Sequence, residues 1–264
     1  MSHPLHLPRI VYLPGRKLLG VLYFEKIVPE AKGVFGSICA KYKIIVLDEI
    51  LTAPPSFEEK RAKKLIFLDI TDSSITRDSL FKELEGSGFF KIIDVVEPVA
   101  EGLLIDHVSH PIFISDHRAV IFWSSLYRVL KAIRGRFGTG GEAFLFYEGL
   151  DAGLETGRYS YEMVKSVGLS DPLEVFQKVF TKMFQAAGFG RMEVLELSDS
   201  GGRIAIYDCF ECELGKGEGR PYAAFVRGLL AGALKYLLNK EFQVKELWCL
   251  ATGYSHCLFE LRAQ

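Results

Sequence analysis

Four of the five cysteines in this 264-residue chain lie toward its C-terminal end, at positions 209, 212, 249 and 257. Residues 245–261 predict a terminal β-hairpin that turns at residues 252–254. A three-residue loop would place Cys249 opposite Cys257, close enough for both thiolates to bind one metal ion. A two-residue loop would instead pair Leu250 with Cys257. A shared metal site therefore depends on the register of this hairpin.

The remaining cysteines are in different settings. Residues 204–212 follow a period of two, which predicts a strand. A regular strand would point Cys209 and Cys212 to opposite faces, so it cannot direct both thiols into one site. Cys39 lies on the apolar stripe of a predicted helix, and we expect it to belong to the core.

The composition is that of an ordinary folded protein, with 49% hydrophobic residues, 25% charged residues and a formal net charge of −1. These values exclude a disordered chain, and the absence of a basic excess argues against direct nucleic-acid binding. No apolar run reaches the ~18 residues of a membrane helix, and the N-terminal residues do not form a signal or transit peptide. We therefore expect a cytoplasmic protein, in whose reducing surroundings clustered cysteines more often bind metal or act in redox chemistry than form disulfides.

Residues 1–106 predict a first domain in which short strands and helices alternate. The order is βαββαβ, that of the ferredoxin-like plait, and it resembles an ACT-like regulatory domain in order and length. ACT domains often bind amino acids at a glycine-containing turn after the first strand, but residues 25–28 contain no glycine. We therefore expect a structural or dimerising plait. The predicted strands are 18–24, 43–52, 64–69 and 89–96, and the helices begin at Pro29 and at a cap formed by Thr76.

Residues 107–264 predict a second domain of long helices and strands. Two of its helices repeat glycine every four residues, and each such glycine costs ~1 kcal/mol relative to alanine. The glycines therefore indicate that something approaches these helix faces closely, either another helix or a ligand in a glycine-lined groove. The predicted helices are 120–137, a second after the turn at 138–141 with Gly149, Gly153 and Gly157, one that begins at Pro172, and 222–239 with Gly228 and Gly232.

The helix that begins at Pro172 carries phenylalanine and methionine side chains along one stripe and ends before Gly188. Such a stripe is usually core, although it can also form the wall of an apolar pocket. If the domain encloses a ligand, we expect the pocket to be lined by Trp123, Gly149, Gly153, Phe176, Phe180, Gly228 and Gly232.

The C-terminal pattern resembles the signature of the vinyl-4-reductase domain family. Glu246 and Cys249 are followed after seven residues by Cys257, and a glycine-bearing helix precedes them. The resemblance covers roughly residues 107–264. It implies an α+β fold akin to subunits of the TRAPP vesicle-tethering complexes, and an ACT-like domain before it matches an arrangement associated with archaeal members.

In sensor members of that family the signature supports a zinc site made by one glutamate and three cysteines. By position, Glu246, Cys249 and Cys257 match three of these ligands, whereas Ala223 stands where the family has its remaining cysteine. Cys212, or Cys209, would then supply the fourth ligand that a closed zinc site needs. In the alternative interpretation, the site has decayed and the cysteines are ordinary buried residues.

No catalytic motif stands out: the chain has no G-x-S-x-G or H-E-x-x-H pattern. The resemblance implies a non-enzymatic sensor or regulatory protein that binds a small apolar, aromatic or lipid-like molecule. It would form a homodimer and act through protein partners. Two alternatives remain, which are an accessory or reductase-like factor in tetrapyrrole or hydrocarbon metabolism and a TRAPP-like assembly scaffold.

Overall fold

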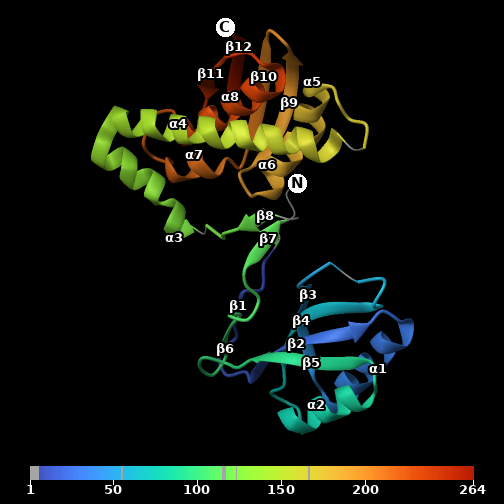
Figure 1. The fold of residues 1–264 in the computed structure, drawn as a ribbon. Helices are drawn as coiled ribbons and strands as arrows, with labels where there is room; N and C mark the ends of the chain where they lie inside the picture. The colour runs from blue at the N-terminus through green and yellow to red at the C-terminus, as the bar shows by residue number, and fades with distance from the viewer. Residues whose placement is uncertain (1–5, 55, 115–116, 123, 166) are drawn as a thin grey trace. The chain divides into compact units, whose positions relative to one another are not determined.

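The computed structural model describes residues 6–54, 56–114, 117–122, 124–165 and 167–264, and the chain forms two compact units, residues 1–120 and 121–264 (Figure 1). Each unit has its own four-stranded sheet with helices, so the mixed α+β class is confirmed. The sequence placed the boundary after residue 106, and the interval to residue 120 contains the short antiparallel pair β7 (Ile112–Ile114) and β8 (His117–Ala119). No helix among the described residues has the length and apolar character of a membrane span.

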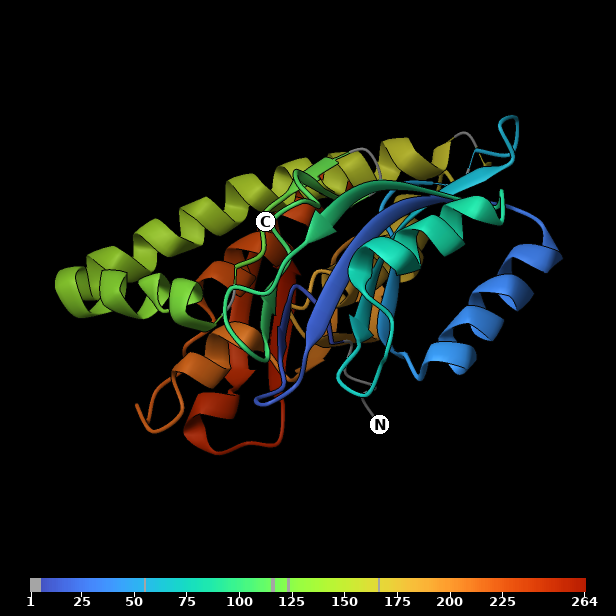
Figure 2. The same ribbon diagram turned by 90° about the horizontal axis from the view of Figure 1, so that it is seen from below.

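The first unit is built on a sheet with the strand order β3-β4-β2-β5, in which every neighbouring pair is antiparallel. Helices α1 and α2 pack on one face of this sheet (Figure 2). Thr76 caps α2 as expected, because its side chain accepts a hydrogen bond from the N–H of Ser79. The elements are β1 (Ile10–Tyr12), β2 (Leu18–Lys26), α1 (Pro29–Tyr42), β3 (Ile45–Leu51), β4 (Arg61–Asp69), α2 (Arg77–Gly86), β5 (Phe90–Val96) and β6 (Leu103–Ile105).

Strand β2 shows why its sequence is an almost unbroken apolar run. Leu19 and Val21 belong to the core beneath the two helices, whereas Leu18 and Leu22 belong to a smaller core on the opposite face. Leu104 of β6 closes that second core, and β6 pairs with β1. A strand that is covered on both faces has no solvent side on which polar residues would be needed.

The second unit contains an antiparallel sheet with the strand order β11-β12-β10-β9. The buried helix α8 contacts both β11 of this sheet and the long helix α4. The elements are α3 (Ser124–Tyr127), α4 (Val129–Lys165), α5 (Pro172–Val175), the π-helical turn η1 (Phe176–Phe180), α6 (Thr181–Ala186), β9 (Arg191–Ser198), β10 (Gly201–Tyr207), α7 (Phe210–Leu214), α8 (Ala224–Leu238), β11 (Phe242–Trp248), the 3₁₀ turn η2 (Leu250–Thr252) and β12 (Cys257–Ala263).

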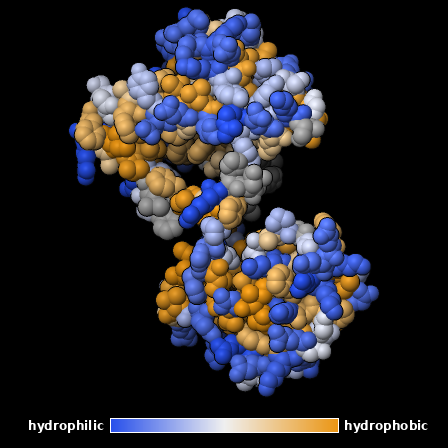
Figure 3. Space-filling model, viewed as in Figure 1, coloured by the Kyte–Doolittle hydropathy of each residue, from blue (hydrophilic) through white to orange (hydrophobic). Residues whose placement is uncertain are grey.

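Helix α4 consists of two helical segments that meet at a kink, in agreement with the break that the sequence predicted at residues 138–141. The break is shorter than that turn, because only Gly138 leaves the helical conformation, at φ 54° and ψ −130°. A left-handed φ of this kind is accessible to glycine without strain. Near this kink, Phe137 and Phe144 expose 67% and 53% of their surface, and apolar side chains cover this end of α4 (Figure 3).

Candidate metal centre

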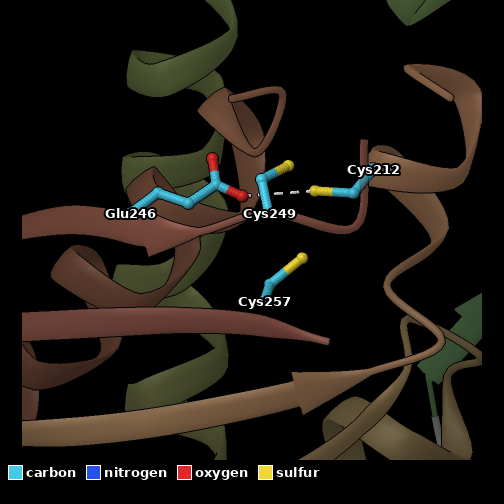
Figure 4. Close-up of side chains that lie close together, drawn as sticks. All are labelled: Cys212, Glu246, Cys249 and Cys257. Atoms are coloured by element: carbon cyan, nitrogen blue, oxygen red, sulfur yellow. Dashed lines mark hydrogen bonds between the residues drawn. The ribbon is translucent and has the colours of Figure 1, made fainter. Parts of the chain in front are cut away.

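Three separate segments bring the predicted metal ligands together (Figure 4). Glu246 lies on β11, Cys249 precedes the turn η2, and Cys257 is the first residue of β12. Cys212 comes from the short helix α7. The strand predicted for residues 204–212 is wrong in its second part, because β10 ends at Tyr207 and Asp208 adopts a left-handed φ of 53°. The chain thereby leaves the sheet and enters α7.

The terminal hairpin brings Cys249 and Cys257 to the same end of two paired strands. Trp248 pairs with Leu258 in the last rung of the ladder, so the two cysteines are the next residues beyond it. Residues 249–256 then form the connection and include the turn η2, which makes it longer than either predicted loop. A bulge between Glu246 and Trp248 shifts the register of Trp248, the last residue of β11. The two cysteines therefore lie together without being joined by a tight turn.

The cluster offers four potential ligand atoms, three thiol sulfurs and one carboxylate oxygen, all within 4.8 Å of one another. Cys212, Cys249 and Cys257 are at most 1% exposed, and Glu246 is partly buried. Zinc–sulfur bonds of about 2.3 Å in a tetrahedral site separate the sulfurs by roughly 3.8 Å. The donor types and their number therefore fit a closed zinc site after a contraction of about 1 Å.

Backbone N–H groups support the charged forms of these ligands. The N–H of Ala251 donates to Sγ of Cys249 at 3.3 Å, and the N–H of Leu250 donates to Sγ of Cys257 at 3.4 Å. Such donors stabilise a thiolate relative to a thiol. They also fix the orientation of the sulfur, as the hydrogen-bonded surroundings of metal ligands commonly do.

The carboxyl group of Glu246 is held from two sides. Its Oε2 accepts a hydrogen bond from the N–H of Ala223 at 3.1 Å, and its Oε1 lies 3.5 Å from Sγ of Cys212, which donates to it. Burial, followed by the hydrogen bond and charge of Cys249, raises the pKa of Glu246 to about 8. Negative charge is thus unfavourable among these acidic groups unless a cation accompanies it.

Ala223, the position at which the sequence departs from the family signature, contributes only its backbone to the cluster. Cys212 from α7 is the fourth member of the cluster. Cys209 is fully buried beside this cluster, and hydrogen bonds from Cys212 and Cys257 lower its pKa to about 6. The geometry therefore selects Cys212 over Cys209 as the fourth member of the cluster.

The glycines predicted to line a pocket lie in the contact between α4 and α8. A Cβ atom on Gly149 or Gly153 would come within 2.2 Å of the carbonyl oxygen of Phe225 or Leu229 on α8. A Cβ atom on Gly228 would lie 2.0 Å from a carbonyl oxygen of α4, and Gly232 is equally close. Close helix packing, one of the two interpretations of the pattern, therefore accounts for these glycines, and a groove there stays a prediction.

The other predicted pocket residues lie elsewhere. Phe176 and Phe180 are at most 1% exposed, and their rings stack with centroids 4.9 Å apart in the core of the second unit. Trp123 lies outside the described residues. A ligand next to the two phenylalanines would have to displace packed side chains.

A buried ion pair next to the cluster gave no signal in the sequence. Arg134 of α4 pairs with Glu211 of α7, and both side chains are at most 2% exposed. The carboxylate of Glu211 also accepts hydrogen bonds from the N–H groups of Phe225 and Val226, at 3.0 and 2.9 Å. Glu211 thereby binds the first turn of α8, where unpaired N–H groups favour negative charge. This ion pair connects α4, α7 and α8.

Comparisons with known proteins find a family match in the second unit. The family model of the vinyl-4-reductase domain matches residues 203–263. An uncharacterized protein of Methanocaldococcus jannaschii is 26% identical over 140 residues, which are 52% of this chain and 76% of that protein.

Among solved structures, the phenol-responsive sensory domain of the transcription activator PoxR with phenol has a TM-score of 0.50 and 17% identity. The match covers 57% of this chain and 79% of that chain, and it is a likeness of fold. A vinyl-4-reductase family protein from Methanocaldococcus jannaschii has a TM-score of 0.32 and 18% identity, covering 55% of this chain and 99% of that one. Residues 203–263 thus match the vinyl-4-reductase domain family, and all four side chains of the cluster lie within this segment.

Proposed function

We propose that residues 121–264 form a non-enzymatic, small-molecule-responsive domain of a regulatory protein. The observation that carries the proposal is the likeness of its fold to the phenol-responsive sensory domain, and the vinyl-4-reductase family match to residues 203–263 supports it. The ligand would be a small apolar molecule, either aromatic or acyl. The buried phenylalanines of η1 and the interface between α4 and α8 are the elements that would have to open around it.

Native mass spectrometry of the full chain tests this function. A sensor domain is expected to release a co-purified aromatic or acyl compound, or to gain the mass of phenol when phenol is added. The variant Phe180→Ala enlarges the interior where the rings of Phe176 and Phe180 stack, and it should change the affinity for the added compound. Repeated failure to observe any small-molecule adduct, with native and with added compounds, would contradict a sensor function.

The first unit is part of the same proposal. Its strand order β3-β4-β2-β5 and its two helices on one face support an ACT-like plait with a structural or dimerising role. We propose that the protein is a cytoplasmic homodimer that transmits ligand binding to a protein partner. Neither segment carries a basic excess, with 14 basic and 15 acidic residues in 1–106 and 18 of each in 107–264, and this balance favours a protein partner over DNA.

We propose zinc as the resident metal of the cluster. Cys212, Cys249, Cys257 and Glu246 would hold it with four protein ligands, which leaves no open position for a substrate and gives the metal a structural role. Bound zinc would join α7 to the terminal hairpin and would offset two of the four negative charges of the deprotonated ligands. Because all four ligands lie within the segment that matches the family, the metal would stabilise that domain directly.

Zinc content measured by elemental analysis on chelator-washed and zinc-reloaded protein tests this site. We expect about one zinc per chain in the unmodified protein, and essentially none in Cys257→Ala, because the three remaining ligands no longer close the site. Cys39→Ala is the matched control, since Cys39 is a buried cysteine of the first unit and lies outside the cluster. Absence of zinc from the unmodified protein, or full retention by Cys257→Ala, would contradict a zinc site.

A further inference from the structure

A cavity of about 290 Å³ lies beside the metal cluster, at the end where α8 begins. Its walls come from α4, from the segment before α8, from α8 itself and from β11. Glu246 belongs to the wall of this cavity as well as to the cluster. The volume approaches the ~300 Å³ at which small-molecule sites begin. The cavity is thus large enough for a small ligand and is separate from the apolar interior considered above.

The cavity is lined by more positive than negative side chains. Arg134, Arg220, Arg227 and Lys245 line it together with Glu142 and Glu246. Arg220 forms an ion pair with Glu142, so these two charges balance. Within the part of the chain that the structure describes, neither Arg227 nor Lys245 has an ion-pair partner. Two cations therefore line the same cavity without an ion-pair partner, and Glu246 is the acidic residue of the wall that remains beside them.

Arg134 adds a buried donor to the same wall. The residue is only 4% exposed. Its Nη2 donates to Glu211 and to the carbonyl oxygen of Tyr222, and its Nη1 donates to the carbonyl oxygen of Leu130. Its Nε is buried and has no hydrogen-bond partner. Leaving a buried donor unpaired costs about 1–3 kcal/mol, so an acceptor within the cavity would be favoured.

The N-terminus of α8 contributes only indirectly to the preference of the cavity for a negatively charged group. Its first N–H groups are already used, because Ala223 donates to Glu246 and both Phe225 and Val226 donate to Glu211. The side chains of Arg227 and Lys245 are thus the direct binding groups that remain. The helix dipole would add a smaller favourable contribution for negative charge at this end.

We propose that this cavity binds the oxyanion group of a small ligand, a carboxylate or a phosphate, between Arg227 and Lys245. A guanidinium group can donate two parallel hydrogen bonds to such a group, and the lysine ammonium supplies a second positive charge. Arg220 and Arg134 are balanced by Glu142 and Glu211, so Arg227 and Lys245 face one remaining acidic residue, Glu246, and the positive charge is in excess. This site goes beyond the proposed apolar ligand and does not require that ligand to exist.

Isothermal titration calorimetry of the full-length, zinc-reloaded protein with inorganic phosphate and, separately, with benzoate at constant ionic strength tests this inference. We expect saturable binding of at least one probe below about 10 mM. Arg227→Gln and Lys245→Gln should each weaken it about tenfold, as expected for the loss of a charge-assisted hydrogen bond. Whichever probe binds more tightly identifies the oxyanion.

Arg262→Gln is the matched control, because it removes the same charge from an arginine on β12 whose side chain is 68% exposed and lies outside the cavity. It should leave the affinity within about twofold of the original. Equal weakening by Arg262→Gln would mean that the probes respond to net charge, and lack of binding by both probes to the folded protein would also overturn the inference. Circular dichroism spectra of all three variants establish that each is folded.

Discussion

Replacing Gly228 with alanine is expected to destabilise the second unit by about 3 kcal/mol, measured as the free energy of unfolding in urea. The new Cβ would lie 2.0 Å from the carbonyl oxygen of Phe146, a backbone atom that cannot move aside by a side-chain rotation. The same geometry is repeated one turn later, where Gly232 meets the carbonyl oxygen of Leu150. The helices α4 and α8 would therefore have to separate along their contact. The free energy lost from the contact between α4 and α8 must exceed the ~1 kcal/mol that alanine contributes as the better helix former.

Gly135→Ala is the matched control for this substitution. Gly135 also lies within a helix, α4, but no atom lies within 4 Å of the position that its Cβ would take. Alanine there should leave stability unchanged or raise it by up to about 1 kcal/mol. A Gly228→Ala protein that is as stable as Gly135→Ala would show that the two helices are not held by backbone contact at these glycines.

The sequence predicted the existence of this contact but not its two partners. Glycines repeated every four residues share a helix face, and their cost in helix stability requires a compensating close approach. The pattern does not identify the approaching group, because a ligand and a second helix both require a helix face without bulky side chains. Only the folded chain pairs Gly153 with Leu229, two residues more than 70 positions apart.

The assignment of Cys212 shows a different limit of sequence analysis. The period of two in residues 204–212 predicts a strand through residue 212. In a strand, the side chains of Cys209 and Cys212 would point to opposite faces. The change of direction occurs at Asp208, a non-glycine residue in the left-handed region. Such a conformation has only a weak sequence signal, since it is adopted where the surrounding structure imposes it. One backbone angle thus decides whether the fourth member of the cluster can reach the other three.

The hairpin was predictable for a simpler reason. Glu246 and Cys257 lie on two strands that are adjacent in the chain, and Cys249 directly follows the first of them, so local pairing brings all three to one end of the hairpin. In contrast, Arg134 and Glu211 come from elements that pack only in the folded protein. Each is an ordinary charged residue in the sequence, where charged residues are mostly exposed.

Removal of the Glu211 carboxylate is expected to cost about 3–5 kcal/mol of the free energy of unfolding, because Glu211→Ala leaves the buried guanidinium of Arg134 without its counter-charge. Burial raises the pKa of Glu211, whereas Arg134 and the N–H groups of α8 oppose that rise. The substitution also leaves the N–H groups of Phe225 and Val226 without an acceptor. Urea unfolding followed by circular dichroism measures the loss.

Glu213→Ala separates this effect from the general loss of one negative charge in α7. Glu213 lies two residues further along the same helix, but its side chain is 46% exposed and its contact with Lys216 is 3.4 Å long. An exposed pair of this kind contributes less than about 1 kcal/mol. Equal destabilisation by the two substitutions would contradict a specific role for the buried pair.

A double substitution identifies the source of the loss. If the uncompensated charge of Arg134 is responsible, replacing both members with apolar residues, as in Arg134→Met with Glu211→Leu, should restore part of the stability that Glu211→Ala loses. If the loss arises instead from the unpaired N–H groups at the start of α8, the double variant should remain as unstable as Glu211→Ala. Recovery of more than half of the loss would therefore assign the larger share to charge, and no recovery would assign the loss to the capping of α8.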